Sequence, residues 1–274
     1  MLSILNNIPS LVAQNDLQVT AGNLQNTLEQ LASGQRINSG ADDAAGLAIA
    51  DGLQANETAL NQSAMNANDG IGALQVADGA LSQVTTLLNR AVTLATESST
   101  GTVSDSQRTA IQAEFAQIQA EITSIGQSTE FNGTSVFTAN PTSIFLSDGN
   151  SAANTTISVS VGTLSATGIG LTASIDLSSA ADAQTALGLI TTAISTVAGD
   201  RGTIGANVNR LQASVNVENV EVQNLTAAED SIMSVDVATA VSNLSKYSML
   251  QQTGIAAVGQ ANSSQQGLLQ LLQG

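Results

Sequence analysis

The chain has 274 residues and a formal net charge of −16, from 22 acidic and 6 basic residues, and it contains no His and no Cys. This composition excludes imidazole and thiolate chemistry, disulfides, and the clustered basic side chains that bind nucleic acid or anionic membranes. Hydrophobic residues make up 42% but aromatic residues only 2%, so the apolar content is mostly aliphatic and suits closely packed long helices.

The sequence predicts neither a cleavable leader nor a membrane span. Residues 1–13 have no basic segment and are interrupted by Asn6, Asn7 and Pro9, so a cleavable secretion signal is not expected. No apolar run reaches about 18 residues, so no transmembrane helix is expected either.

The first expected helix covers about residues 4–32 and carries two apolar rows with a seven-residue repeat. One row is Leu5, Val12 and Val19, and the other is Leu17, Leu24 and Leu31, with Leu28 beside it. Two apolar rows on one helix predict contact with more than one neighbour. Ser33 and Gly34 are expected to end the helix.

Two more helices are expected at about 43–98 and 105–127, separated by a turn at 99–104. In the first, residues spaced seven apart are apolar without a miss: Leu53, Leu60, Ala67, Leu74, Leu81, Leu88 and Ala95. In the second, the spacing alternates between four and three, as in a coiled-coil seam: Ile111, Phe115, Ile118, Ile122 and Ile125.

Residues 129–178 differ in composition and are expected to form a small β-hairpin region. The segment is rich in Ser, Thr, Gly and Asn and begins Phe131-Asn132-Gly133. Polar and apolar residues alternate over 156–161 and again over 168–177, and this period of two predicts strands.

The remaining chain predicts a long helix over about 180–232 and a final helix beyond residue 236. A three-four apolar ladder runs from Leu187 to Ile232, with Arg201, Glu218 and Glu229 at ladder positions between the apolar ones. The final helix repeats the pattern with polar residues at several ladder positions, which weaken an isolated coiled coil but fix its register.

The predicted fold is mainly α, an elongated antiparallel coiled-coil bundle with the β-hairpin region inserted in its middle. We expect residues 1–40 and 235–274 to pair as one domain of terminal helices, and residues 41–234 to form a second domain of longer helices. The sustained period near 3.5 predicts left-handed supercoiling and a rod.

The termini predict an assembly surface. Asp236 and Lys246 are the only charged residues between 231 and 274, and a pair of helices leaves apolar rows with nothing to cover them in a monomer. A bundle with frayed ends is the alternative, and periodicity alone does not choose between them. The apolar positions expected to take part in assembly are Leu5, Val12, Leu17, Val19, Leu24, Leu28, Leu31, Val237, Val241, Leu244, Ile255, Val258, Leu268, Leu269 and Leu272.

Several blocks of residues resemble bacterial flagellins. They are Ser33 to Ser39 (SGQRINS), Asp42 to Ile49 (DDAAGLAI), Asn68 to Ile71 (NDGI), Phe131-Asn132-Gly133, Asn209-Arg210-Leu211 and Gln260-Ala261-Asn262. The blocks occur in the family's order over about 1–135 and 185–274, so the resemblance covers all but the β region.

The resemblance implies a non-enzymatic subunit, without cofactor or metal, that polymerises into a hollow extracellular filament for motility. It also implies type III export with an uncleaved signal, an export chaperone, a cap protein at the growing tip and contact with hook-junction proteins. Polar contacts in the layer outside the terminal helices are then expected at Arg36, Asn38, Asp42, Asp43, Asn209 and Arg210.

The chain departs from the family pattern at two places. The joint before the final helix reads Glu229-Asp230-Ser231-Ile232-Met233-Ser234, where the family's usual arginine and one acid are both serine, so an ion pair there is not expected. The segment that some animal innate receptors recognise is expected at Arg90, Leu94 and Glu114. In this segment Thr93 replaces a glutamate of the family pattern, which predicts weaker recognition.

Other assignments are weaker on chemical grounds. Asp42 and Asp43 precede a helix, where capping explains two acids better than a metal pair does. Asp69 and Asp78 lack the spacing of a calcium loop. The rival functions are a hook–filament junction protein, which shares the terminal helices, and a secreted adhesin or binding module, which needs a recognition surface in 134–180.

Overall fold

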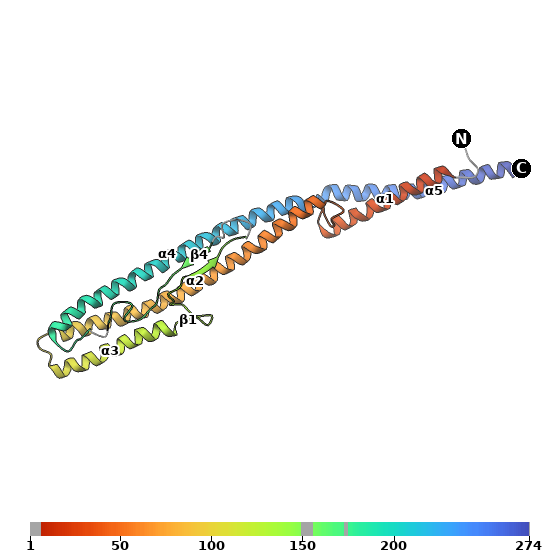
Figure 1. The fold of residues 1–274 in the computed structure, drawn as a ribbon. Helices are drawn as coiled ribbons and strands as arrows, with labels where there is room; N and C mark the ends of the chain where they lie inside the picture. The colour runs from red at the N-terminus through yellow and green to blue at the C-terminus, as the bar shows by residue number, and fades with distance from the viewer. Residues whose placement is uncertain (1–6, 149–155, 173–174, 274) are drawn as a thin grey trace. The chain divides into compact units, whose positions relative to one another are not determined.

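The computed structural model of the chain describes residues 7–148, 156–172 and 175–273, apart from the side chains of 268–273. Five helices occupy most of the described chain: α1 Ile8–Ser33, α2 Ala44–Ser98, α3 Asp105–Ser128, α4 Ala180–Met233 and α5 Val237–Gln273. The prediction of a mainly helical chain with long antiparallel helices is confirmed (Figure 1).

The chain divides into two compact units. Unit 1 contains residues 1–55 and 224–274, and unit 2 contains residues 56–223. The helices α2 and α4 therefore each contribute one end to unit 1 and the longer remainder to unit 2.

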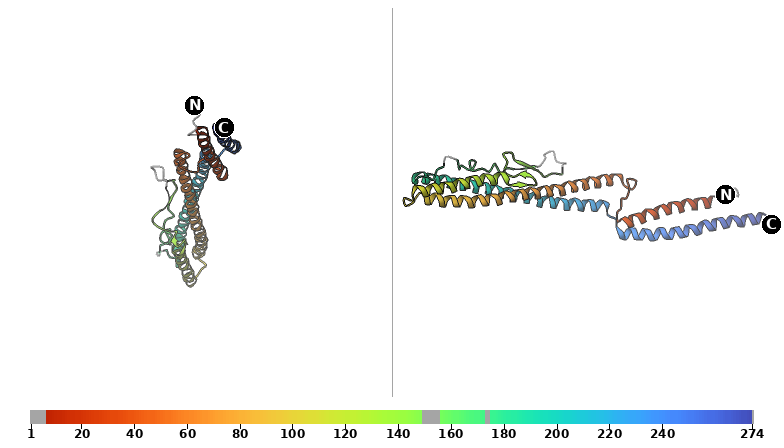
Figure 2. Two further views of the ribbon diagram at one scale, coloured as in Figure 1. Left: turned by 90° about the vertical axis from the view of Figure 1, so that its right-hand side faces the viewer. Right: turned by 90° about the horizontal axis from the view of Figure 1, so that it is seen from below.

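In unit 1, α1 and α5 lie side by side and run antiparallel (Figure 2). The Asn7 side chain caps α1 by accepting a hydrogen bond from the Ser10 amide at 3.2 Å, and Pro9 occupies the first turn, where its missing N–H costs nothing. Gly34 ends α1 in the left-handed conformation, with φ of 73° and its amide bonded to the Gln30 carbonyl. The expected stop at Ser33 and Gly34 is confirmed.

In unit 2, α3 folds back along α2, and α4 runs antiparallel to α2 (Figure 2). A capping box begins α3: Ser104 accepts from the Gln107 amide, and the Gln107 side chain accepts from the Ser104 amide. The expected seam of α3 is buried at Ile111, Phe115, Ile118 and Ile122. On α2 the buried positions include the expected Leu60, Ala67, Leu74, Leu81, Leu88 and Ala95.

Two short hairpins form the β region. Strands β1 Glu130–Phe131 and β2 Thr134–Ser135 pair across Asn132 and Gly133, whose φ values of 51° and 72° are those of a type I′ turn. Strand β3 Thr142–Phe145 pairs antiparallel with β4 Thr156–Val159. The alternating stretch at 156–161 is therefore a strand for most of its length, as predicted.

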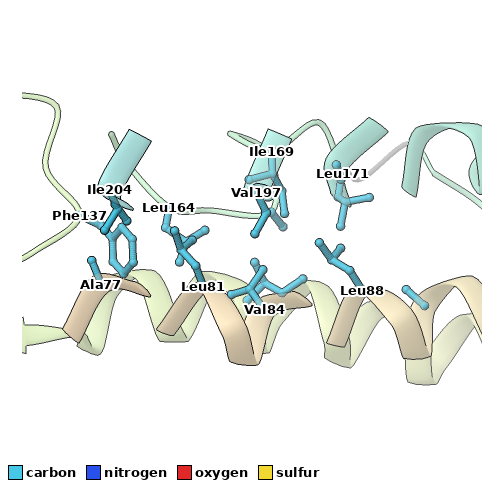
Figure 3. Packing of buried hydrophobic residues seen from close by; sticks show 14 of the residues in the cluster. Ala77, Leu81, Val84, Leu88, Phe137, Leu164, Ile169, Leu171, Val197 and Ile204 are labelled. Atoms are coloured by element: carbon cyan, nitrogen blue, oxygen red, sulfur yellow. The ribbon is translucent and has the colours of Figure 1, made fainter. Parts of the chain in front are cut away.

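The second alternating stretch, 168–177, is not a strand where the structure describes it. It forms a turn and irregular chain, yet Ile169, Leu171, Ile175 and Leu177 are all buried. Figure 3 shows Leu164, Ile169 and Leu171 pointing toward Leu81, Val84 and Leu88 of α2. The alternation reflects a turn and irregular chain that bury every second residue against the helices without a partner strand, and this is why the prediction of a strand was wrong.

Candidate assembly surfaces and polar contacts

The terminal helices divide their apolar residues between an inner row and an outer row. Leu17, Leu24 and Leu31 on α1 are half-buried, as are Leu244 and Val258 on α5. A Cβ added to Gly254 of α5 would lie 3.1 Å from Leu17 Cδ1, so this inner row lies directly between the two helices. One of the two predicted α1 rows therefore packs on α5.

The outer row is exposed within the described chain. On α1 the exposed large apolar residues are Ile8, Leu11, Val12 and Val19, on the side away from the inner row, and Leu28, beside that row; 48–68% of each residue is exposed. On α5 they are Val237, Val241, Met249, Leu250 and Ile255, with exposures of 44–66%. We call these ten residues the outer apolar face of unit 1. The predicted positions Leu5, Leu268, Leu269 and Leu272 lie outside the residues whose side chains the structure describes.

Polar groups fix the register of α1 on α5. Asn262 Oδ1 accepts hydrogen bonds from Ser10 Oγ at 2.9 Å and from Asn7 Nδ2 at 3.1 Å. Asn262 stands at one of the polar ladder positions of the sequence, and it meets the N-terminal cap of α1. Sliding the helices by one turn would remove both bonds, so this contact specifies register in the way expected of a polar seam residue.

The segment joining α1 to α2 pairs with the segment joining α4 to α5. The Arg36 amide donates to the Met233 carbonyl at 2.6 Å, and the Val235 amide donates to the Gly34 carbonyl at 3.1 Å. The Arg36 guanidinium also donates to the Ile232 carbonyl, from Nη2 at 2.9 Å. These bonds join the two connections of unit 1 although Ser231 stands where the family has arginine.

The predicted polar residues of this segment bond mainly within the chain. Asp42 Oδ2 accepts from the Asn38 and Ser39 amides at 3.1 and 2.9 Å, and these bonds lower the pKa of Asp42. Asp43 caps α2 by accepting from the Gly46 amide at 2.9 Å and lies 3.9 Å from the Arg36 guanidinium. Capping is therefore the observed role of Asp43, as expected for two acids before a helix.

Asp236 caps the final helix in the same way. Its carboxylate accepts from the Ala238 amide at 3.0 Å and the Thr239 hydroxyl at 2.7 Å, and these contacts, with that of the Thr239 hydroxyl largest, lower the pKa of Asp236. The acid that the sequence retains at this joint serves the helix terminus.

Ion pairs tie the helices of unit 2. Arg201 of α4 binds Asp78 of α2 through two bonds of 2.7 and 3.2 Å. Arg90 of α2 binds Glu114 of α3 through two bonds of 2.7 and 3.1 Å. The predicted pair of Asn209 and Arg210 is exposed, and the described chain offers the Arg210 guanidinium no ion pair.

Leu94 of the predicted receptor surface is buried, and the receptor surface itself stays a prediction. Only 1% of Leu94 is exposed, because it belongs to the core between α2 and its neighbours. Arg90 and Glu114 are about half exposed and lie on the surface, whereas Leu94 has no surface to offer a receptor.

Arg108 is a structural residue that the sequence reading missed. Its buried guanidinium donates to the Ser98 carbonyl at 2.9 Å, the Thr100 carbonyl at 2.9 Å and Asp105 Oδ1 at 3.1 Å, and so holds the turn between α2 and α3. Arg108 precedes Ile111 by three residues and so continues the α3 seam toward its start. This position on the seam of α3 is the sequence signal from which the burial of Arg108 could have been predicted.

The described residues contain no group of three or more acidic side chains placed to hold a metal ion. Within the same ranges no helix combines the length and apolar character needed to cross a membrane. Antiparallel helices with an uncovered apolar face and a polar register contact are the features expected of a subunit of a larger helical assembly.

Comparison with known proteins identifies that assembly. Residues 4–142 match the bacterial flagellin N-terminal helical region, and residues 187–272 match the C-terminal helical region. The flagellin of Halalkalibacterium halodurans is 34% identical over 98% of this chain and 99% of its own length. The flagellar filament 30.7 kDa core protein of Treponema maltophilum is 32% identical with the same coverage.

Solved structures agree. The crystal structure of Bacillus cereus flagellin matches with a TM-score of 0.50 and 26% identity, over 56% of this chain and 88% of that one. A putative flagellar hook-associated protein from Vibrio parahaemolyticus shares the fold, with a TM-score of 0.59 at 14% identity over 70% of this chain and all of that one.

The chain belongs to the bacterial flagellin family and is a non-enzymatic structural subunit of the extracellular flagellar filament. Membership of this family implies self-polymerisation.

Proposed function

We propose that the outer apolar face of unit 1 is the surface through which copies of this chain bury one another in the filament. The observation that carries the proposal is the exposure of ten large apolar residues on two helices that carry almost no charge. At about 25 cal/mol per Å² of apolar area removed from water, covering such a face provides a driving force for association. Heterologous contacts of this kind generate an open helical polymer when the rotation does not close.

The layers of the filament follow from the same proposal. The terminal segments 1–40 and 235–274 would form the innermost layer of a hollow filament, and residues 41–234 the layer outside it. In that layer Asn209 and Arg210 are the best-placed polar contacts, because their side chains are exposed. Arg36, Asn38, Asp42 and Asp43 form bonds within unit 1, so any intersubunit contact from them comes in addition to these bonds.

The same surface fits the partners that the family resemblance implies. An export chaperone would cover the apolar residues of α5 before assembly, and a cap protein would shield growing ends. We also propose that the chain is exported unfolded by the type III route with an uncleaved signal. In the filament it would contact hook-junction proteins and transmit torque for motility.

The hook-associated neighbour shares the fold, so the fold alone does not separate a filament subunit from a junction protein. The relatives that align over nearly the full chain are called flagellin or filament core protein, and this favours the filament subunit. An adhesin would need a recognition surface in 134–180. Among the described residues of this range, which belongs to the region of the two two-stranded sheets, Phe145 is the exposed large apolar residue.

The test introduces charge into the outer apolar face. A variant with Val12→Asp, Val19→Asp and Ile255→Asp is compared with a control carrying Gln14→Asp, Gln18→Asp and Gln252→Asp, which adds the same charge at exposed polar positions of the same helices. Dissociated subunits are seeded in neutral buffer with salt and imaged by negative-stain electron microscopy.

We expect long uniform filaments from the wild type and the control and none from the first variant, with unit 2 still helical by circular dichroism. Normal filaments from the first variant would overturn the proposal for this face. Wild-type subunits that never elongate seeds would also contradict the proposal.

A further inference from the structure

Glu218 carries a carboxylate into the packing between α2 and α4 of unit 2. Only 6% of Glu218 is exposed to solvent. Its Oε1 accepts one hydrogen bond, from Ser63 Oγ at 2.8 Å. Its Oε2 is also buried and has no hydrogen-bond partner among the described residues. An ionised carboxylate with one oxygen unsatisfied is a costly group inside a helix interface.

Among the residues that the structure describes, no cation forms an ion pair with this carboxylate. On α4 the nearest basic residue is Arg210, eight residues away, and the nearest acid is the exposed Glu221, one turn away. On α2 the acids Glu57 and Asp69 flank Ser63 at six residues on either side, and Arg90 is the sole basic residue of that helix. On these two helices, therefore, no basic residue lies within seven positions of Glu218 or Ser63 along the chain.

The surroundings raise the pKa of Glu218 on balance. Burial raises the pKa of Glu218, the Ser63 hydrogen bond lowers it by a smaller amount, and the charge of Glu221 raises it further. Glu218 also stands at a ladder position of α4, where most neighbouring positions are apolar. A neutral acid suits this position better than a carboxylate does.

The position of Glu218 along the chain gives the contact its significance. It is the last buried residue of α4 in chain order, after Leu211 and Val215. Unit 2 ends five residues later, at Gln223, and the α2 side of the unit begins at Asn56. The Ser63–Glu218 bond therefore lies near this end of unit 2, where Leu60 is the buried apolar residue of α2 beyond it in the described part of the unit.

We propose that Glu218 is a proton-controlled latch between α2 and α4. When Glu218 binds a proton from solvent, the neutral acid packs in the seam and the end of unit 2 is held closed. When the proton leaves, the buried negative charge favours separation of the two helices at this end. In the filament the latch sets how firmly each subunit holds its long helices together as external pH changes.

The direction of the pH dependence follows from the raised pKa. A group whose pKa is higher in the folded than in the unfolded chain stabilises the fold fully below the unfolded pKa, and this contribution is lost as pH rises through the folded pKa. Acidification from neutral pH to just above the ordinary pKa of glutamic acid therefore strengthens the latch.

The test compares Glu218→Gln with Glu221→Gln in full-length dissociated subunits. The first substitution mimics the protonated acid at the buried site, and the second removes the same charge from the exposed neighbour on the same helix. Thermal unfolding is followed by circular dichroism from about pH 4 to about pH 8 at constant ionic strength. We expect E218Q to melt about 2–5 °C above the wild type at the alkaline end and to converge with it at the acidic end.

The control E221Q is expected to keep a nearly constant offset across the same range. Parallel curves for the two variants would overturn the proposal. A second measurement does not depend on the folding of E218Q: a carboxyl ¹³C titration of wild-type Glu218 by NMR. A midpoint above that of exposed glutamates is expected, and a midpoint at or below theirs would overturn the latch.

Discussion

The guanidinium of Arg36 donates two hydrogen bonds to the main-chain carbonyl oxygen of Ile232, from Nη2 at 2.9 Å and from Nε at 3.3 Å. Because the four C-terminal carbonyls of a helix lack intrahelical partners, a cation at this end of α4 satisfies one of them and opposes the helix dipole. Arg36 thus provides from the α1–α2 connection a positive charge that Ser231 does not provide from α4 itself.

Replacing Arg36 by Ala is expected to loosen the paired connections of unit 1. Losing these bonds costs about 1 kcal/mol, which corresponds to roughly fivefold faster hydrogen exchange at the amides of Arg36 and Val235. Hydrogen–deuterium exchange with mass spectrometry measures this. Arg210→Ala is the control, because it removes an exposed arginine that forms no ion pair in the described chain. Unchanged exchange in R36A would show that the backbone pairing alone holds the joint.

Gly126 is expected to be intolerant of alanine although it lies inside a helix. A Cβ at this position of α3 would overlap the carbonyl oxygen of Leu164. The gain in helix propensity, about 1 kcal/mol, is outweighed by an overpacking cost of about 1–3 kcal/mol. Gly79→Ala is the matched control, since a Cβ there has nothing within 4 Å.

Thermal unfolding of dissociated subunits tests the pair of glycine variants. G126A is expected to melt below the wild type, and G79A to melt above it by about 2–4 °C. A G126A variant as stable as G79A would mean that the segment carrying Leu164 moves away without cost.

Asp78 is expected to give a pH dependence opposite in sign to that of Glu218. The Arg201 guanidinium lowers the pKa of Asp78, mainly through its hydrogen bonds. A carboxylate with a lowered folded pKa stabilises above its unfolded pKa, and this contribution disappears as pH falls through the folded value. Because both side chains are more than a third exposed, the pair contributes only about 0.5 kcal/mol.

Asp78→Asn is therefore expected to melt about 1–2 °C below the wild type at neutral pH and to converge with it below about pH 3. Added salt should reduce the difference at neutral pH. Asp69→Asn serves as control, because Asp69 is an exposed acid of the same helix. A D78N deficit that grows on acidification would contradict the assigned pair.

The helices were predictable because each seam repeats over many turns, and one wrong residue does not erase a period of 3.5. The same ladder placed Glu218 at a seam position and could have placed Arg108. The strand expected at 168–177 was wrong because alternation of burial requires only one covered face, whereas a strand also requires a partner. The burial of Leu94 was not predictable from the family motif, because a motif gives residue identities and does not say which side chains are covered by the core.

The partner of Arg36 was not predictable at all. Its acceptor is a main-chain carbonyl, which carries no sequence signal, and Ile232 lies 196 positions away. Pairings of this kind depend on how the two connections fold back on each other, and only the structure reveals that.

Thr93 is expected to limit recognition by the animal innate receptors that bind flagellins. Arg90 and Glu114 are paired on the surface, but the Thr93 hydroxyl donates to the Asn89 carbonyl at 3.1 Å and offers no negative charge. Thr93→Glu would restore a carboxylate one turn from Arg90, and reporter-cell potency should then increase. The control Thr86→Glu makes the same change at an exposed threonine of α2 four residues before Arg90, and it should leave potency unchanged. Full potency of the wild-type protein, or an equal gain from both variants, would contradict a specific role for position 93.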